Sequence, residues 1–123
     1  MLVVDDSAVS RRMVCRAVIM SGLDVSEILE ASNGQEGYLK LCQEGPDVVI
    51  CDLLMPVMDG IAFLTMVQKH EVPTPIIIVS ADIQSTTRQQ CLQLGALAFL
   101  NKPCDQQALM ELLRGVEAQR GTL

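Results

Sequence analysis

Five short runs rich in β-branched and other apolar residues recur along the 123-residue sequence, and this repetition constrains the fold more than any other feature. The runs lie at 2–4, 25–29, 48–51, 76–79 and 97–100. Between them lie helical patterns of about ten to fifteen residues, long enough for a crossover from one parallel strand to the next. The runs at 48–51 and 76–79 are apolar without alternation, which is typical of strands covered by helices on both faces. The pattern predicts an α/β fold, a doubly wound (βα)5 three-layer sandwich around a five-stranded parallel sheet.

Residues that begin helices stand at the expected places between these runs. Ser7, Asp59 and Asp105 can each cap the N-terminus of a helix, because a side-chain oxygen there accepts a hydrogen bond from a free backbone N–H group. Ser32 and Gln35 have the spacing of a capping box for the second helix. These signals agree with an alternating order of strand and helix.

The first helix is predicted to be amphipathic. Val9, Met13, Ala17 and Met20 recur at helical spacing, and this stripe is expected to face the core. Gly22 is expected to end the helix, because glycine readily adopts the left-handed conformation found just after many helices.

The composition excludes several classes of function. Half of the residues are hydrophobic and 20% are charged, which excludes intrinsic disorder. A net charge of −6 has the wrong sign for holding a phosphate backbone, and one Tyr, two Phe and no Trp are too few to stack bases. No apolar run approaches the roughly 18 residues of a membrane span. The chain is therefore expected to be soluble and cytoplasmic, with no contact to nucleic acid or membrane.

The five cysteines and the single histidine do not form a metal-binding motif. No two cysteines have the Cys-x-x-Cys spacing of zinc or redox sites. The cysteines are expected to be reduced and mostly buried, and His70 is expected to be a solvated surface residue.

Charged and hydroxyl residues follow the predicted strands where each strand ends. In an open α/β sheet these positions share one edge, so Asp5, Asp6, Asp52, Ser80 and Lys102 are expected to lie together. Any one of them alone is commonly a cap or turn residue. Three carboxylates about 4 Å apart, however, repel by about 4 kcal/mol per pair at an effective dielectric constant of 20. The group therefore predicts a cation, and oxygen donors without histidine or thiolate indicate a hard ion. Mg²⁺ is favoured over Ca²⁺ because so few protein ligands leave several waters in place.

The motifs at this edge resemble those of the receiver domains of two-component response regulators (CheY-like). They are Asp5-Asp6-Ser7, residues 52–60 with the sequence DLLMPVMDG, Ser80-Ala81 and Lys102-Pro103. The resemblance covers essentially the whole chain, so residues 1–123 are expected to form a single receiver domain. It implies the flavodoxin-like strand order 2-1-3-4-5.

The resemblance also implies roles for the acidic residues. Asp52 would be the phosphoacceptor. Asp6, Asp52 and the backbone carbonyl of Leu54 would bind Mg²⁺ directly, and Asp5 would hold the ion through water. Phosphoryl transfer requires positioning and charge neutralisation more than covalent chemistry, and a carboxylate is an established nucleophile for it.

Four residues near the end of the chain complete the implied site. Ser80 and Lys102 would each contact a phosphoryl oxygen, and the peptide bond before Pro103 would be cis. Phe99 would be the switch aromatic that turns inward when Ser80 moves. The surface that changes shape on phosphorylation, and that a partner would bind, would then consist of the fourth helix, the fifth strand and the fifth helix.

The implied function is that of a phosphoacceptor in His-Asp signal transduction, not an enzyme acting on other molecules. The phosphodonor would be a sensor histidine kinase or a histidine phosphotransfer protein. The output partner would be a downstream protein, an output domain or a second copy of the chain. A stand-alone receiver and a receiver within a longer regulator both remain open.

Three other functions are compatible with an α/β fold of this kind. A flavodoxin would need to bind a flavin phosphate next to Asp5-Asp6-Ser7, which repels it. A phosphohydrolase would need a second acid or base and a substrate pocket, and neither is visible in the sequence. A degenerate receiver would serve only as a docking module, although all the expected catalytic residue types are present.

Overall fold

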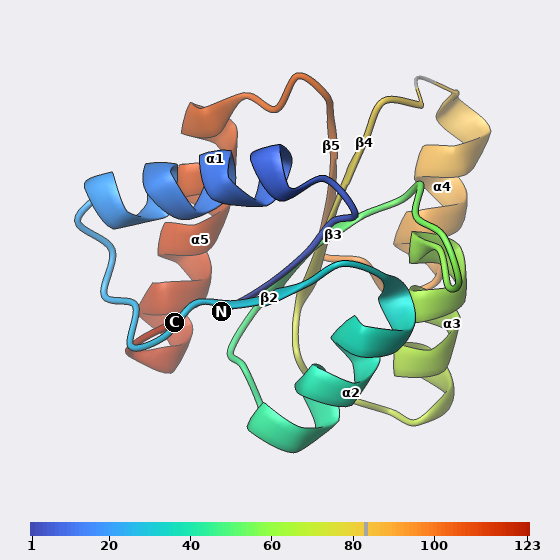
Figure 1. Cartoon of the computed structure of the whole chain (residues 1–123), viewed down its shortest axis with the longest axis horizontal. Helices are drawn as coiled ribbons and strands as arrows, with labels where there is room; N and C mark the ends of the chain where they lie inside the picture. Colours follow the sequence, from blue (N-terminus) through green and yellow to red (C-terminus); the bar gives the residue numbers. More distant parts are fainter. Residues whose placement is uncertain (83) are drawn as a thin grey trace.

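The computed structural model describes residues 1–82 and 84–123. Five parallel strands form one sheet in the order β2-β1-β3-β4-β5, as predicted (Figure 1). The strands are β1 (Leu2–Val4), β2 (Leu29–Ala31), β3 (Val49–Asp52), β4 (Ile76–Ser80) and β5 (Ala98–Asn101). Because all strands run in the same direction, their carboxyl ends meet at one edge of the sheet.

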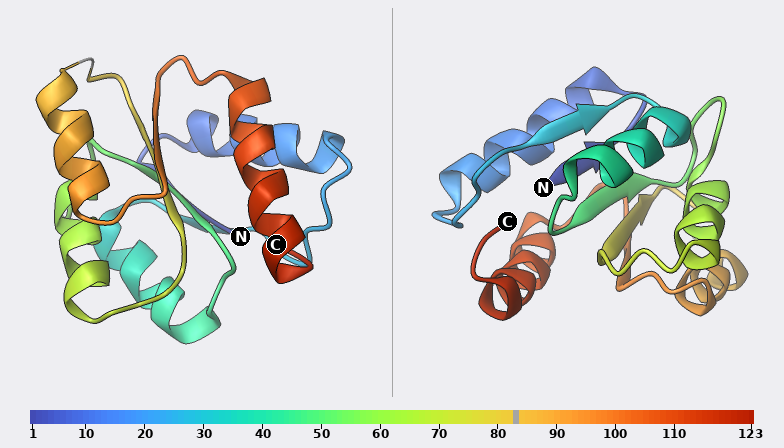
Figure 2. Two further views of the ribbon diagram at one scale, coloured as in Figure 1. Left: turned by 180° about the vertical axis from the view of Figure 1, so that it is seen from behind. Right: turned by 90° about the horizontal axis from the view of Figure 1, so that it is seen from below.

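Helices cover both faces of the sheet (Figures 1 and 2). They are α1 (Ala8–Met20), α2 (Gly34–Glu44), α3 (Gly60–Lys69), α4 (Ser85–Gln93) and α5 (Gln106–Arg120). One buried cluster joins the sheet to α2, α3 and α4, and a second joins it to α1 and α5. The doubly wound sandwich expected from the sequence is therefore confirmed.

The central strands supply side chains to both clusters. On β3, Val49 and Cys51 belong to the cluster under α2–α4, whereas Ile50 belongs to the cluster under α1 and α5. All three are buried. Burying an aliphatic side chain of this size contributes about 1.5–3 kcal/mol, so this strand holds the acidic residue at its end on a rigid support.

The second strand lies later in the sequence than predicted. It spans Leu29–Ala31 rather than 25–29, with Leu29 opposite Leu2 and Ala31 opposite Val4. Its partner β1 is only three residues long, so pairing extends no further. Val25 and Ile28 are apolar because they pack against the cluster under α1 and α5 from an irregular segment.

The predicted caps of α1, α3 and α5 are correct, and the cap of α2 is displaced by one residue. Asn33, not Ser32, caps α2: its Oδ1 accepts a hydrogen bond from the Glu36 N–H at 2.9 Å. The Glu36 carboxylate in turn accepts hydrogen bonds from the N–H and hydroxyl groups of Ser32. Asn caps helices as well as Ser does, so residue preference alone does not separate the two positions.

The inward face of α1 also differs from the prediction. Val18 is the buried residue of this helix, and Val14, Cys15 and Ala17 pack partly against the core. Val9, Met13 and Met20 of the predicted stripe are exposed instead. Helix α1 carries apolar residues on two faces, so periodicity could not select between them. In this orientation Arg11 is bonded to Glu30 and to the backbone carbonyl of Asp5.

The structure bears on the expectations about membrane spans and cysteines. Among the described residues, no helix combines the length and the apolar character needed to cross a bilayer. The cysteines are free thiols, but the expectation that most of them are buried is wrong. Cys51 and Cys91 are buried, Cys15 and Cys104 are half-buried, and Cys42 is exposed.

Candidate functional site

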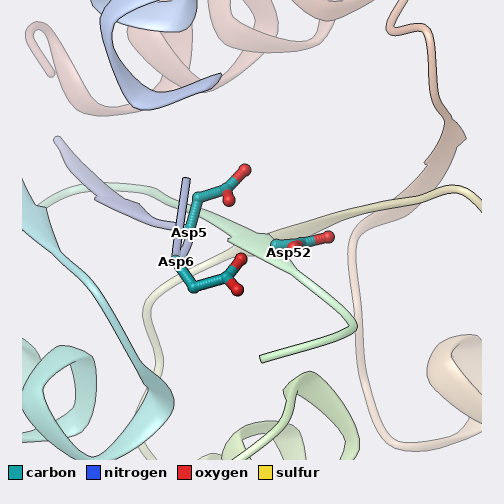
Figure 3. A group of neighbouring side chains, drawn as sticks. All are labelled: Asp5, Asp6 and Asp52. Carbon is teal, nitrogen blue, oxygen red and sulfur yellow. The ribbon is translucent and has the colours of Figure 1, made fainter. Parts of the chain in front are cut away.

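Three carboxylates meet where β1 and β3 end (Figure 3). Val4 and Cys51 are paired neighbours in the sheet, so the residues that follow them emerge side by side. One carboxylate oxygen of each of Asp5, Asp6 and Asp52 lies within 4.8 Å of the others. Asp5 and Asp52 are buried and Asp6 is exposed. The acidic cluster expected from the sequence is thus present, open to solvent on the side of Asp6.

Lys102 reaches this cluster from β5. Its Nζ lies 3.2 Å from Oδ2 of Asp5 and 3.3 Å from Oδ1 of Asp52. Its backbone N–H donates a hydrogen bond to the carbonyl of Ser80 at 2.7 Å, which fixes the end of β5 beside the end of β4. The peptide bond between Lys102 and Pro103 is cis, the isomer that the resemblance implies.

The charges in the site perturb one another. Burial and the charge of Asp5 raise the pKa of Asp52 above its usual value, although Lys102 acts in the opposite direction. Burial acts to lower the pKa of Lys102, but the charges of Asp5 and Asp52 outweigh it, so the pKa of Lys102 is raised. One ammonium group faces three carboxylates, so the site carries excess negative charge that a cation would neutralise.

The donor set fits a hard divalent cation. Asp5, Asp6 and Asp52 offer carboxylate oxygens only, with no imidazole or thiolate in the cluster. Because the cluster offers only a few protein oxygens, a bound ion would keep several water ligands, which is the coordination that Mg²⁺ favours. The carboxylates of Asp5, Asp6 and Asp52 are the groups that could hold it, and the part expected of the Leu54 backbone carbonyl stays a prediction.

Ser80 and Phe99 lie on adjacent strands behind the acidic cluster. Ser80 is fully buried, and its Oγ accepts a hydrogen bond from the Asp82 N–H at 3.0 Å. Phe99 is 3% exposed, so its ring already lies inside the cluster under α2–α4. Its backbone carbonyl accepts a hydrogen bond from Nη1 of Arg88 at 3.3 Å. A second position of Phe99, as the switch requires, stays a prediction.

Two features near the site were not predicted from the sequence. Arg11 Nη1 donates a hydrogen bond to the carbonyl of Asp5 at 2.6 Å and so holds the loop after β1. A cavity of about 270 Å³ between the sheet, α1 and α5 reaches Asp5, Asp52 and Lys102. Its other described lining residues are mostly apolar, and the polar ones among them are Ser10, Cys104 and Gln106. Neither feature has a recognisable signal in the sequence: Arg11 is one arginine in a helix, and the cavity depends on how distant elements pack.

Val57 is strained on the rim of the site. Its φ is +68°, a left-handed conformation that is unfavourable for a β-branched residue, and its side chain is 77% exposed. We expect Val57→Asn to raise the free energy of unfolding by about 1 kcal/mol, because Asn tolerates this conformation. Denaturant titration measures the effect. Val9→Asn, at an exposed valine in helix α1, is the control, since Val and Asn have similar helix propensities. A less stable Val57→Asn would contradict the strain argument.

The raised pKa of Asp52 predicts a pH-dependent stability. A carboxyl group whose pKa is higher in the folded state stabilises the fold below its unfolded pKa of about 3.9, and this stability is lost as pH rises through the folded pKa. In chelator, Asp52→Asn should therefore raise the melting temperature at pH 7 and change it little near pH 3.5. Equal effects of Asp52→Asn at both pH values would refute the prediction.

Comparisons with known proteins agree with this geometry. A family model described as the response regulator receiver domain matches residues 1–114. A protein-glutamate methylesterase/protein-glutamine glutaminase of Syntrophomonas wolfei is 41% identical over 110 residues, which are 88% of this chain and 31% of that protein. A homologue of the same name from Treponema denticola is 37% identical over 105 residues, 83% of this chain and 28% of that protein. The chain thus spans less than a third of the length of these relatives.

Solved structures show the same fold over nearly the whole chain. The receiver domain of the Francisella response regulator 1452 superposes with a TM-score of 0.88 at 25% identity, covering 97% of this chain and 96% of that one. The Vibrio cholerae chemotaxis protein CheY4 gives a TM-score of 0.81 at 32% identity, with 94% and 95% of the two chains covered.

Proposed function

Because this chain belongs to the response regulator receiver domains, we propose that its Asp52 accepts a phosphoryl group from a phosphohistidine. The donor would be a sensor histidine kinase or a histidine phosphotransfer protein, and the site would require Mg²⁺. The observation that carries the proposal is the convergence of Asp5, Asp6 and Asp52 with the ammonium group of Lys102.

The proposed reaction transfers a phosphoryl group between two side chains. A carboxylate oxygen of Asp52 forms a bond to phosphorus as the phosphorus–nitrogen bond of the donor breaks. The imidazole leaves with the electron pair of that bond and takes up a proton, and Asp52 becomes an acyl phosphate. Asp52 must be ionised to attack, and the nearby ammonium group favours that form.

Lys102 and Ser80 would bind the transferred group. Lys102 now pairs with Asp5 and Asp52, and its Nζ can donate to a phosphoryl oxygen that arrives on Asp52. The Ser80 Oγ already accepts a hydrogen bond from the Asp82 N–H, which leaves its own O–H free to donate to a second phosphoryl oxygen. Bound Mg²⁺ would neutralise negative charge on the phosphoryl oxygens.

The rim of the site offers a contact surface for the phosphodonor. Four apolar side chains are more than half exposed on α1 and on the loop after β3, namely Val9, Met13, Leu54 and Val57. A donor whose imidazole reaches Asp52 must approach over this edge of the sheet. Exposed apolar side chains beside a polar site are typical of surfaces that bind another protein.

The output surface is proposed on α4, β5 and α5. A shallow groove there is lined by apolar side chains with one charge of each sign at its sides, Arg88 and Glu111. Leu92 and Leu97 are partly exposed along it. The occupant would be a downstream protein, an output domain or a second copy of the chain. Residues 1–123 would act as one receiver domain that catalyses only its own phosphorylation and dephosphorylation.

The test is the mass of the intact protein after treatment with acetyl phosphate and Mg²⁺. The wild-type chain should gain one phosphoryl group, and Asp52→Asn should gain none. Asp59→Asn is the matched control: it lies in the same segment, and asparagine retains the ability to cap α3. A mass gain that persists in Asp52→Asn, or that requires no Mg²⁺, would reject the proposal.

A further inference from the structure

Helix α4 is weakly anchored by packing. Among its described residues, Cys91 is the one that the core buries. Its N-cap residue Gln84 makes no side-chain capping hydrogen bond within the described part of the chain. By contrast, α5 buries four side chains and is capped by Asp105. The start of α4 must therefore be held by groups outside the helix.

Asp82 holds the start of α4 through both oxygens of its carboxylate. Oδ1 accepts a hydrogen bond from the Gln84 N–H at 2.9 Å, and Oδ2 accepts one from the Thr87 hydroxyl at 3.0 Å. The first bond reaches the N-cap residue itself, and the second reaches a side chain in the first turn of the helix. Movement of Asp82 would therefore move or release the first turn of the helix.

The backbone of the same residue is tied to the functional site. The Asp82 N–H donates to Oγ of Ser80 at 3.0 Å, and the Asp82 carbonyl accepts from Nδ2 of Asn101 at 3.0 Å. Asn101 precedes Lys102 and lies opposite Ser80 in the sheet. Asp82 is thus bonded to one residue that would contact a phosphoryl oxygen and to the neighbour of the other.

We propose that Asp82 is the link by which occupation of the site changes the first turn of α4, and that Thr87 is the positioning residue that engages it. The inference rests on the proposed function, because it assigns the stimulus to a phosphoryl group on Asp52. When the Ser80 hydroxyl turns to donate to that group, its Oγ shifts relative to the Asp82 N–H. The carboxylate passes this shift to Gln84 and Thr87.

Amide hydrogen exchange tests the link, with beryllofluoride and Mg²⁺ standing in for the phosphoryl group. The informative amides are Gln84, whose N–H is bonded to Asp82, and Arg88, whose N–H is bonded to the Gln84 carbonyl. In the wild-type protein, saturation with beryllofluoride should change their exchange rates by about two- to tenfold, the range expected for one hydrogen bond. Chemical shifts of Lys102 and Ser80 report occupation of the site independently.

Substitutions at two adjacent threonines separate a link from a purely structural role. Thr87→Val removes the hydroxyl that binds Asp82 and should abolish the response of Arg88 while beryllofluoride still binds. Thr87→Ser keeps the hydroxyl and should restore the response. Thr86→Val makes the same change at an exposed neighbour, for which the described chain shows no side-chain hydrogen bond, and should behave as wild type.

The possible outcomes distinguish a failure of the Asp82 link from a failure of the proposed function. If Thr87→Val alters exchange equally with and without beryllofluoride, so that the ratio remains that of the wild type, Thr87 is only structural and the link is wrong. If beryllofluoride binds the wild-type protein but leaves Gln84 and Arg88 unchanged, the link is also wrong while the proposed function stands. If beryllofluoride fails to bind at all, both are overturned.

Discussion

Replacing Lys102 with Met is expected to slow phosphorylation by acetyl phosphate by about 100- to 1,000-fold, the usual effect of removing one preorganised donor from a reacting oxygen. The same substitution should tighten the binding of Mg²⁺. In the structure the ammonium group lies 3.2 and 3.3 Å from Asp5 and Asp52, where it neutralises part of the charge that would otherwise attract the cation. The loss of one ammonium group is thus expected to slow phosphorylation and to strengthen Mg²⁺ binding.

Two measurements check this prediction. The initial rate of mass gain gives the phosphorylation rate, and calorimetric titration with Mg²⁺ alone gives the affinity. Lys69→Met is the control, because it removes the same charge from an exposed position in the last turn of α3. If Lys102→Met weakened Mg²⁺ binding together with phosphorylation, the fold of the site rather than the charge of Lys102 would be responsible.

Replacing Gly60 with Ala is expected to destabilise the fold by about 1–3 kcal/mol, as overpacking does. A Cβ atom at this position would lie 2.8 Å from the carbonyl oxygen of Asp52 and 2.8 Å from Cα of Leu53. Both are backbone atoms at the end of β3, and the Gly60 N–H donates to the Leu53 carbonyl at 2.8 Å. A Cβ at position 60 would therefore push the start of α3 away from the end of β3, where Asp52 lies.

Gly115→Ala is the matched control for Gly60→Ala. Gly115 lies in the middle of α5, and a Cβ there would meet nothing within 4 Å. Alanine should stabilise the helix by about 0.5–1 kcal/mol, because glycine loses more conformational freedom on folding. Denaturant titrations of the two variants should thus differ in sign. A neutral Gly60→Ala would show that α3 can shift away from β3 at little cost.

The architecture could be predicted because its signals are local. The apolar runs at 48–51 and 76–79 are buried on both faces, so their composition alone indicates central parallel strands. Caps such as Ser7 and Asp105 act on N–H groups two or three residues away, and both proved correct. The strand order came from the resemblance carried by the motifs and matches the structure.

The errors arose where the sequence left two alternatives of similar energy. For α2, Ser32 and Asn33 are both good N-caps. For α1, apolar residues on two faces gave two candidate stripes, and the structure shows that the stripe with Val14 and Val18 faces the core. For β2, the apolar segment 25–29 was long enough to pair, but the short β1 set the register at Leu29.

The sequence by itself determined the class of fold, the types of side chain that end the strands and the family to which the chain belongs. Only the tertiary structure decided how those side chains meet: the distances from Lys102 to Asp5 and Asp52, the pKa that burial raises at Asp52, and the bonds that join Asp82 to both Ser80 and α4. The reason is physical. Hydrophobic periodicity and capping act between residues a few positions apart, whereas electrostatic and hydrogen-bond energies depend on distances between residues such as Asp5 and Lys102, which are 97 positions apart in the chain.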